Sequence, residues 1–154
     1  MILPVTFFLA DAPPLPYPEV PEQSDRSTTK SERSRVRVLV VDDEQLIAST
    51  VAAILNIHGF EAEAAFSGEE ALAIARRLDP DIVLSDVLMP RMTGVELGIQ
   101  MRREFPNARI VLFSGQASTA ELMRRAEEDG HRFELFAKPL HPEELIAKLR
   151  GVQA

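Results

Sequence analysis

Five short apolar runs, separated by segments with helical spacing, constrain the fold of this chain more than any other feature. The runs lie at residues 36–41, 61–66, 81–85, 109–113 and 132–137. Between them, apolar residues recur at three- and four-residue intervals, as in Leu46, Ile47, Val51, Ile54 and Leu55, in Ala71, Leu72, Ala75 and Leu78, and in Leu145, Ile146 and Leu149. Strands that alternate with helices in this way predict an α/β fold, in which a parallel sheet is covered by helices on both faces.

The composition of the runs indicates where each strand lies in the sheet. The runs at 36–41, 81–85 and 109–113 are almost uniformly apolar, as expected of central strands that are buried on both faces. The run at 61–66 alternates with charges and predicts an edge strand. In such sheets, sites form at the carboxyl ends of the strands, beside a topological switch point.

Polar side chains stand at the carboxyl ends of four of the five predicted strands. They are Asp42 and Asp43 after the first, Asp86 after the third, Ser114 with Gly115 after the fourth, and Lys138 with Pro139 after the fifth. Three carboxylates, a hydroxyl and an ammonium are therefore expected on one rim of the sheet. Oxygen ligands of this kind suit a hard cation such as Mg²⁺, which takes one or two carboxylates and completes its shell with water and phosphate.

The acids that follow the first run allow two interpretations when they are taken alone. Asp42, Asp43 and Glu44 are consecutive, and crowded carboxylates repel one another unless a cation holds them ionised. Acids also suit the first turn of a helix, where the macrodipole is positive. The stretch itself does not decide between a bound cation and a helix start.

Composition narrows the class of partner and the cellular setting. The net charge of −7 argues against direct binding to nucleic acid, because domains that bind it usually carry a basic face. No apolar stretch approaches the roughly 20 residues that span a bilayer, so no membrane partner is expected. The chain has no cysteine, which excludes thiolate chemistry and suits a reducing cytoplasm.

The chain divides into a tail and one compact domain. Six of the eleven prolines precede residue 22, and the segment that follows is polar, charged and aperiodic. Residues 1–34 are therefore expected to form a disordered tail, because they have too little apolar surface to offset the entropy of ordering. The domain is expected over residues 35–154.

Four motifs resemble those of the receiver domain of two-component response regulators. They are VLVVDDE at 38–44, DIVLSDVLMPRMTGVEL at 81–97, VLFSG at 111–115 and FAKP at 136–139. The resemblance covers residues 36–150, with all four motifs in order at strand ends. It implies the flavodoxin-like strand order 2-1-3-4-5, which the residue pattern alone does not give.

The resemblance implies a phosphorylation site that depends on Mg²⁺. Asp86 would be the phospho-accepting nucleophile, which attacks a phosphohistidine and forms an acyl phosphate. Asp43 would bind the metal directly and Asp42 mostly through water, and Asp86 and the backbone carbonyl of Leu88 would complete the protein ligands. Lys138 would pair with Asp86 and later with a phosphoryl oxygen.

Further roles follow from the same resemblance. The hydroxyl of Ser114 would bond the phosphoryl group, and Gly115 would leave room beside it. Pro90 and Gly94 would shape the loop after the third strand. A cis peptide is usual for the pair equivalent to Lys138 and Pro139.

Two features depart from the family pattern. Many receivers have Tyr or Phe three residues before the fifth-strand lysine, where the ring reports the state of the fourth-strand hydroxyl. Here that position is Leu135, between Phe133 and Phe136, so either Leu135 repacks in a muted way or a register shift lets a phenylalanine substitute. The second departure is length, because a stretch long enough for an output domain does not follow the receiver motifs.

The resulting expectation is a single-domain response regulator that is not an enzyme. It would accept phosphate from a sensor histidine kinase or phosphotransfer protein and dock onto a protein target through its fourth helix, fifth strand and fifth helix, as a monomer or a phosphorylation-dependent dimer. One alternative is a phosphate-independent scaffold with receiver shape. Another is an aspartate-nucleophile phosphatase, although that motif spaces its two acids by one residue and Asp42 and Asp43 are adjacent.

Overall fold

The computed structural model of the 154-residue chain describes residues 33–115 and 119–151. Most of the expected tail, residues 1–32, lies outside the described residues, as does Ser118, whose spacing to Glu121 is that of a helix-capping box. The last two tail residues are described. Arg33 is bound at its guanidinium group, which donates to the carboxylate of Asp79 at 2.7 Å and to its carbonyl at 3.0 Å.

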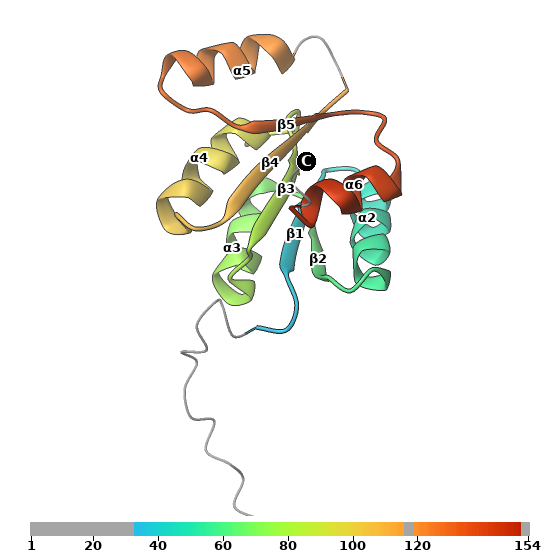
Figure 1. The fold of residues 1–154 in the computed structure, drawn as a ribbon. Coiled ribbons are helices and arrows are strands. Elements are labelled where there is room, and N and C mark those ends of the chain that lie inside the picture. The colour runs from blue at the N-terminus through green and yellow to red at the C-terminus, as the bar shows by residue number, and fades with distance from the viewer. Residues whose placement is uncertain (1–32, 116–118, 152–154) are drawn as a thin grey trace, which may run out of the picture. The chain divides into compact units, whose positions relative to one another are not determined.

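Five parallel strands form one sheet in the order β2-β1-β3-β4-β5, which confirms the predicted fold class (Figure 1). The strands are β1 (Arg37–Val41), β2 (Glu61–Ala65), β3 (Ile82–Asp86), β4 (Arg109–Ser114) and β5 (Glu134–Ala137). The run with alternating charges, β2, is an edge strand as predicted, and the uniformly apolar runs are the three central strands. The switch point lies between β1 and β3, where the chain order reverses.

Five helices are described around this sheet. They are α2 (Gln45–Ile57), α3 (Gly68–Leu78), α4 (Gly94–Glu104), α5 (Thr119–Glu128) and α6 (Pro142–Leu149). None of the helices within 33–115 and 119–151 has the length and apolar character needed to cross a bilayer.

Two apolar layers hold the helices to the sheet, because successive side chains of a strand point to opposite faces. Leu39 and Val83 pack with buried residues of α3 and α4 on one face. Val40 and Leu84 pack with buried residues of α2 and α6 on the other. The sheet is therefore covered on both faces, which leaves its strand ends as the place for polar side chains.

Local sequence signals fix where several helices begin and end. Ser67 caps α3 by accepting from the backbone N–H of Glu70, three residues later, which is the spacing of a capping box. Thr93 and Glu96 form a complete capping box at the start of α4. Gly59 follows the end of α2 with φ of +92°, the left-handed conformation that glycine adopts without strain.

Candidate functional site

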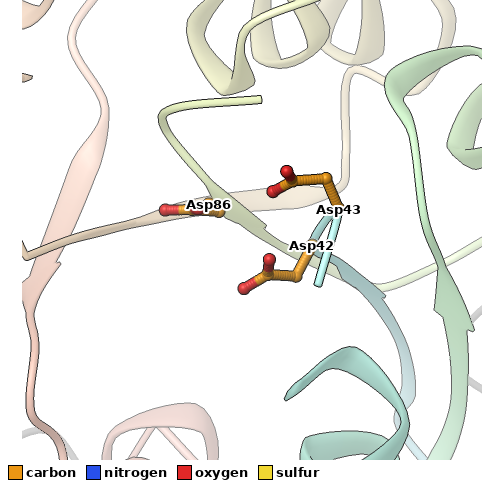
Figure 2. Close-up of side chains that lie close together, drawn as sticks. All are labelled: Asp42, Asp43 and Asp86. Atoms are coloured by element: carbon orange, nitrogen blue, oxygen red, sulfur yellow. The ribbon is translucent and has the colours of Figure 1, made fainter. Parts of the chain in front are cut away.

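Three carboxylates meet at the switch point because of the strand register. The register of β1 on β3 pairs Val41 with Ser85, so the residues that follow, Asp42 and Asp86, leave neighbouring strands side by side. Asp43 is next along the turn. Figure 2 shows the three side chains close together, and one carboxylate oxygen from each acid lies within 4.8 Å of those of the other two.

The first two acids occupy different surroundings. Asp42 is buried, with 5% of its surface exposed, and its carboxylate accepts a hydrogen bond from the backbone N–H of Glu44 at 2.9 Å. Asp43 is exposed to solvent. Glu44, at the start of α2, makes no side-chain cap. The Asp42 carboxylate is therefore fixed by a backbone hydrogen bond, whereas the Asp43 carboxylate is accessible to water.

Lys138 brings a positive charge to the acids from the end of β5. Its ammonium nitrogen lies 3.4 Å from a carboxylate oxygen of Asp86 and 3.7 Å from one of Asp42. Its backbone N–H donates to the carbonyl of Ser114 at 2.8 Å, which extends the pairing of β4 with β5. The Lys138–Pro139 peptide bond is cis, as the resemblance implied.

The electrostatics of the site disfavour charge on two of the acids. Burial raises the pKa of Asp86, although the attraction of Lys138 opposes this shift. Burial also raises the pKa of Asp42, aided by the nearby charge of Asp86 and opposed by the Glu44 N–H. Three carboxylates face one ammonium, so a divalent cation would relieve repulsion that Lys138 balances only in part.

A close backbone approach shapes the loop that follows Asp86. Gly94 donates its N–H to the carbonyl of Val87 at 2.8 Å. A Cβ atom at Gly94 would lie 2.0 Å from the carbonyl oxygen of Asp86, so only glycine fits. Pro90 is exposed in this loop and its carbonyl accepts from Met92, while Leu88 is half-buried two residues after Asp86. The loop therefore turns back so that Gly94 packs against the backbone of Asp86 and Val87.

Ser114 and Gly115 lie at the end of β4, on the same rim of the sheet. The hydroxyl of Ser114 is hydrogen-bonded to that of Thr119, a buried residue at the start of α5. A Cβ atom at Gly115 would meet the Lys138 side chain at 3.4 Å, an ordinary contact distance. The sequence did not single out Thr119, because a threonine at a helix start has many ordinary uses and its partner is five residues earlier in the chain.

Leu135 does not substitute for a buried aromatic ring. It is 46% exposed and pairs in register with Leu112, which lies on the face of the sheet covered by α3 and α4. Phe136 points to the opposite face, where it packs edge-on against Phe113 at 5.9 Å between ring centres. The ring of Phe133 lies under the Arg102 guanidinium at 4.0 Å.

An open cavity of about 500 Å³ adjoins the acids. Asp42, Asp86 and Lys138 form its polar end. Most of its remaining lining is apolar and comes from the sheet, α2, α6 and the segment before α6: Val40, Val41, Ile47, Val51, Leu84, Phe113, Leu140 and Leu145. The acids are therefore reached from solvent beside a largely apolar wall.

The donor set fits a hard divalent cation. The clustered oxygens are all carboxylates, and no sulfur or imidazole ligand takes part in the cluster. Carboxylates with open positions for water suit Mg²⁺ rather than a thiophilic metal. The three carboxylates and the lysine lie together at the strand ends of a doubly wound sheet, the place where sites form in this class of fold.

This chain belongs to the response regulator receiver domain family, whose model matches residues 38–150. It is therefore a receiver domain of two-component systems, a family of signalling switches that are generally not enzymes. It is 34% identical to the response regulator MprA of a Mycobacterium species over 117 residues, which are 76% of this chain and 50% of MprA. It is 32% identical to the probable transcriptional regulatory protein TcrX of Mycobacterium tuberculosis, again over 76% of this chain and 49% of TcrX.

Solved structures of receivers share the fold. The chemotaxis protein CheY4 of Vibrio cholerae superposes with a TM-score of 0.65 at 31% identity, covering 76% of this chain and 98% of that one. A CheY-like receiver domain protein from Methanospirillum hungatei gives a TM-score of 0.68 at 27% identity, over 76% and 92% of the two chains. The chain spans about half the length of the curated relatives it matches.

Proposed function

We propose that this receiver accepts a phosphoryl group on Asp86 from a sensor histidine kinase or a phosphotransfer protein, in a reaction that requires Mg²⁺. The observation that carries the proposal is the position of Asp86, which is 3.4 Å from the Lys138 ammonium and within 4.8 Å of two further acids. Phosphoryl transfer is catalysed mainly by positioning and by cations that neutralise the phosphoryl oxygens.

Four groups of this chain would hold the metal ion: the carboxylates of Asp42, Asp43 and Asp86 and the backbone carbonyl of Leu88. Exposed Asp43 is suited to direct coordination, whereas the Asp42 carboxylate already accepts a backbone hydrogen bond and suits contact through water. When bound, Mg²⁺ supplies charge neutralisation for the phosphoryl oxygens and keeps the acids ionised.

The chemical step is a displacement at phosphorus. A carboxylate oxygen of Asp86 forms the new P–O bond while the P–N bond of the donor phosphohistidine breaks, and the electron pair returns to the imidazole nitrogen. Lys138 then exchanges its contact with Asp86 for one with a phosphoryl oxygen. The hydroxyl of Ser114 leaves Thr119 and bonds the phosphoryl group, with Gly115 beside it.

The output of this switch is a shift between two states of the β4–β5 face. Phosphate acts only through contacts that differ between the states, here those of Ser114 and Lys138. The hydrogen bond between the hydroxyl groups of Ser114 and Thr119 couples the Ser114 hydroxyl to α5. A protein target would dock on α5, β5 and α6 in the cytoplasm, and the receiver itself would bind neither nucleic acid nor membrane.

The exposure of Leu135 favours a second candidate, a scaffold that binds partners without phosphate. An exposed leucine on β5 offers a contact surface and not the buried aromatic switch of many receivers. In this alternative the fold is kept and the acids have no phosphoryl chemistry.

The test is the intact mass of the protein after incubation with acetyl phosphate or phosphoramidate, with Mg²⁺ or with EDTA. We expect one phosphoryl adduct that requires Mg²⁺ and is lost in Asp86→Ala. Asp129→Ala is a matched control, since Asp129 is an exposed acid next to the end of α5. Well-folded protein without an adduct would favour the scaffold, and repeated turnover of phosphomonoesters would indicate a phosphatase.

A further inference from the structure

Helix α2 is an uncharged helix with an apolar outer face. Its thirteen residues, QLIASTVAAILNI, include no acid and no base. The inner face is buried through Ala48, Ala52 and Leu55, as a packed helix requires. On the outside, Leu46 and Ile57 are each 80% exposed. Large apolar side chains that are this exposed do not contribute to the core. When two of them stand on the same helix, they indicate an interaction surface.

Four of the eight exposed residues of α2 form one stripe along the helix, and the other four are Gln45, Ile47, Ser49 and Asn56. Leu46, Thr50, Ala53 and Ile57 are exposed and are spaced by four, three and four residues, which places them on the same side. We call these four residues the outer stripe. The large residues stand at its ends and the small ones at its centre, an arrangement that lets a second helix approach closely in the middle.

Helix α6 lies beside α2 (Figure 1). The first half of α2 and Leu145 line one cavity, while His58 and Leu149 line another at the opposite ends of the two helices. Arg150, just after α6, donates to the carbonyl of His58 at 2.8 Å. The beginnings of both helices therefore lie at one end of this surface and their ends at the other.

Charge is distributed unequally between the two ends of the surface. The end where the helices begin carries four exposed acids, Asp43, Glu44, Glu143 and Glu144, which outnumber the basic residues Lys138 and His141 at the same end. The end where they finish carries Arg35, His58 and Arg150, which line a common cavity. A surface that is neutral along its middle, acidic at one end and basic at the other is complementary to itself when it is turned end for end.

We propose that a second copy of this chain docks on the outer stripe, with the two α2 helices antiparallel about a two-fold axis. In an isologous contact of this kind, both copies use the same surface, so that if one residue of the first copy meets a second residue of the other copy, the reverse contact also forms. Leu46 of one copy then lies on Ile57 of the other, and Thr50 lies opposite Ala53. The acidic end of each copy faces the basic end of the other.

The size of the surface sets the strength of this dimer. A helix of thirteen residues is about 20 Å long and about 10 Å wide. That footprint is well below the roughly 800 Å² per partner of a standard stable interface, even with the flanking charges included. The dimer is therefore weak, with a dissociation constant in the range of about 10 µM to 1 mM. It requires neither phosphate nor Mg²⁺ and does not depend on the proposed phosphorylation.

Sedimentation equilibrium of the full chain in EDTA tests the proposal. We expect the average mass to rise from that of one chain toward that of two between about 5 µM and 1 mM. Leu46→Gln and Ile57→Gln should each raise the dissociation constant at least tenfold, and Leu135→Gln, which alters an exposed leucine on β5, should leave it unchanged. Because Leu46 and Ile57 are exposed, circular dichroism should show intact folding.

A charge exchange tests the antiparallel orientation. Glu143→Arg and Arg150→Glu should each weaken the dimer severalfold, and the double variant should regain the affinity of the parent chain. Added salt should weaken the parent dimer, because the facing charges are exposed. A chain that stays monomeric at about 1 mM, or a dimer that is lost in Leu135→Gln but kept in the two α2 variants, would overturn the proposal.

Discussion

Replacing Asp86 by Asn should stabilise the protein without metal and destabilise it, relative to the parent chain, when Mg²⁺ is present. The carboxylate of Asp86 lies within 4.8 Å of two other acids and 3.4 Å from one ammonium. At an effective dielectric constant of about 20, each repulsion is worth about 3.5 kcal/mol and the attraction about 5 kcal/mol. The two repulsions together exceed the attraction, so the Asp86 carboxylate is subject to a net repulsion. The burial of Asp86 increases this unfavourable energy, and the solvent around Asp43 reduces it.

The magnitude follows from this difference. We expect Asp86→Asn to raise the free energy of unfolding in EDTA by about 1–2 kcal/mol, or the Tm by about 5 °C for a domain of this size. Mg²⁺ at one hundred times its dissociation constant stabilises the parent chain by about 2.7 kcal/mol and the variant far less, so the order of stability reverses. Asp129→Asn should change neither value.

Acid should remove the difference between the parent chain and the variant. The pKa of Asp86 is raised in the folded protein, so the folded state binds the proton more tightly than the unfolded state. As the pH falls from neutral through this raised value toward the ordinary 3.8, the parent chain gains stability and approaches Asp86→Asn. Mg²⁺ binding weakens over the same window, because the metal needs ionised ligands.

The assay is thermal or urea unfolding of the three proteins, in EDTA and in Mg²⁺, at neutral and mildly acidic pH. The reasoning would be refuted if Asp86→Asn were no more stable than the parent chain in EDTA. Equal stabilisation of the parent and variant by Mg²⁺ would also refute it, since the metal would then bind elsewhere.

Three further perturbations have defined outcomes. Gly94→Ala places a Cβ atom against the Asp86 carbonyl, and chemical denaturation should show a loss of about 1–3 kcal/mol together with weaker Mg²⁺ binding. Lys138→Met removes the cation beside Asp86, and adduct formation from phosphoramidate, followed by mass, should slow at least about tenfold while Mg²⁺ still binds in titration calorimetry. Leu97→Ala empties a fully buried position in the core and should cost about 3 kcal/mol in urea unfolding, whereas Leu46→Ala should cost less than about 0.5 kcal/mol.

The fold was predictable because hydrophobic pattern and turn chemistry agree along most of the chain. The uniformly apolar runs became central strands, and the run with alternating charges became the edge strand β2. Helices α4 and α5 were not among the segments predicted from apolar spacing, although Thr93 and Glu96 have capping-box spacing at the start of α4. Strand ends shifted by one or two residues, since terminal pairing depends on neighbours that local sequence does not specify.

The candidate site was predictable in its members and less so in its geometry. A parallel sheet brings strand ends to one rim, so Asp42, Asp86 and Lys138 were expected to meet. The burial that raises the pKa of Asp86 comes from tertiary packing, which a strand-end acid does not reveal. The pairing of Ser114 with Thr119 spans a loop and leaves no short-range signal.

The central claim is that Asp86 itself carries the phosphoryl group, and the most direct measurement is to locate the acyl phosphate in the parent chain. Borohydride reduces an acyl phosphate of aspartate to homoserine, which peptide sequencing by mass spectrometry can place. After incubation with phosphoramidate and Mg²⁺, we expect homoserine at position 86 and not at 42 or 43, and none in EDTA. Homoserine at another acid, or at no acid of a folded protein, would contradict the account.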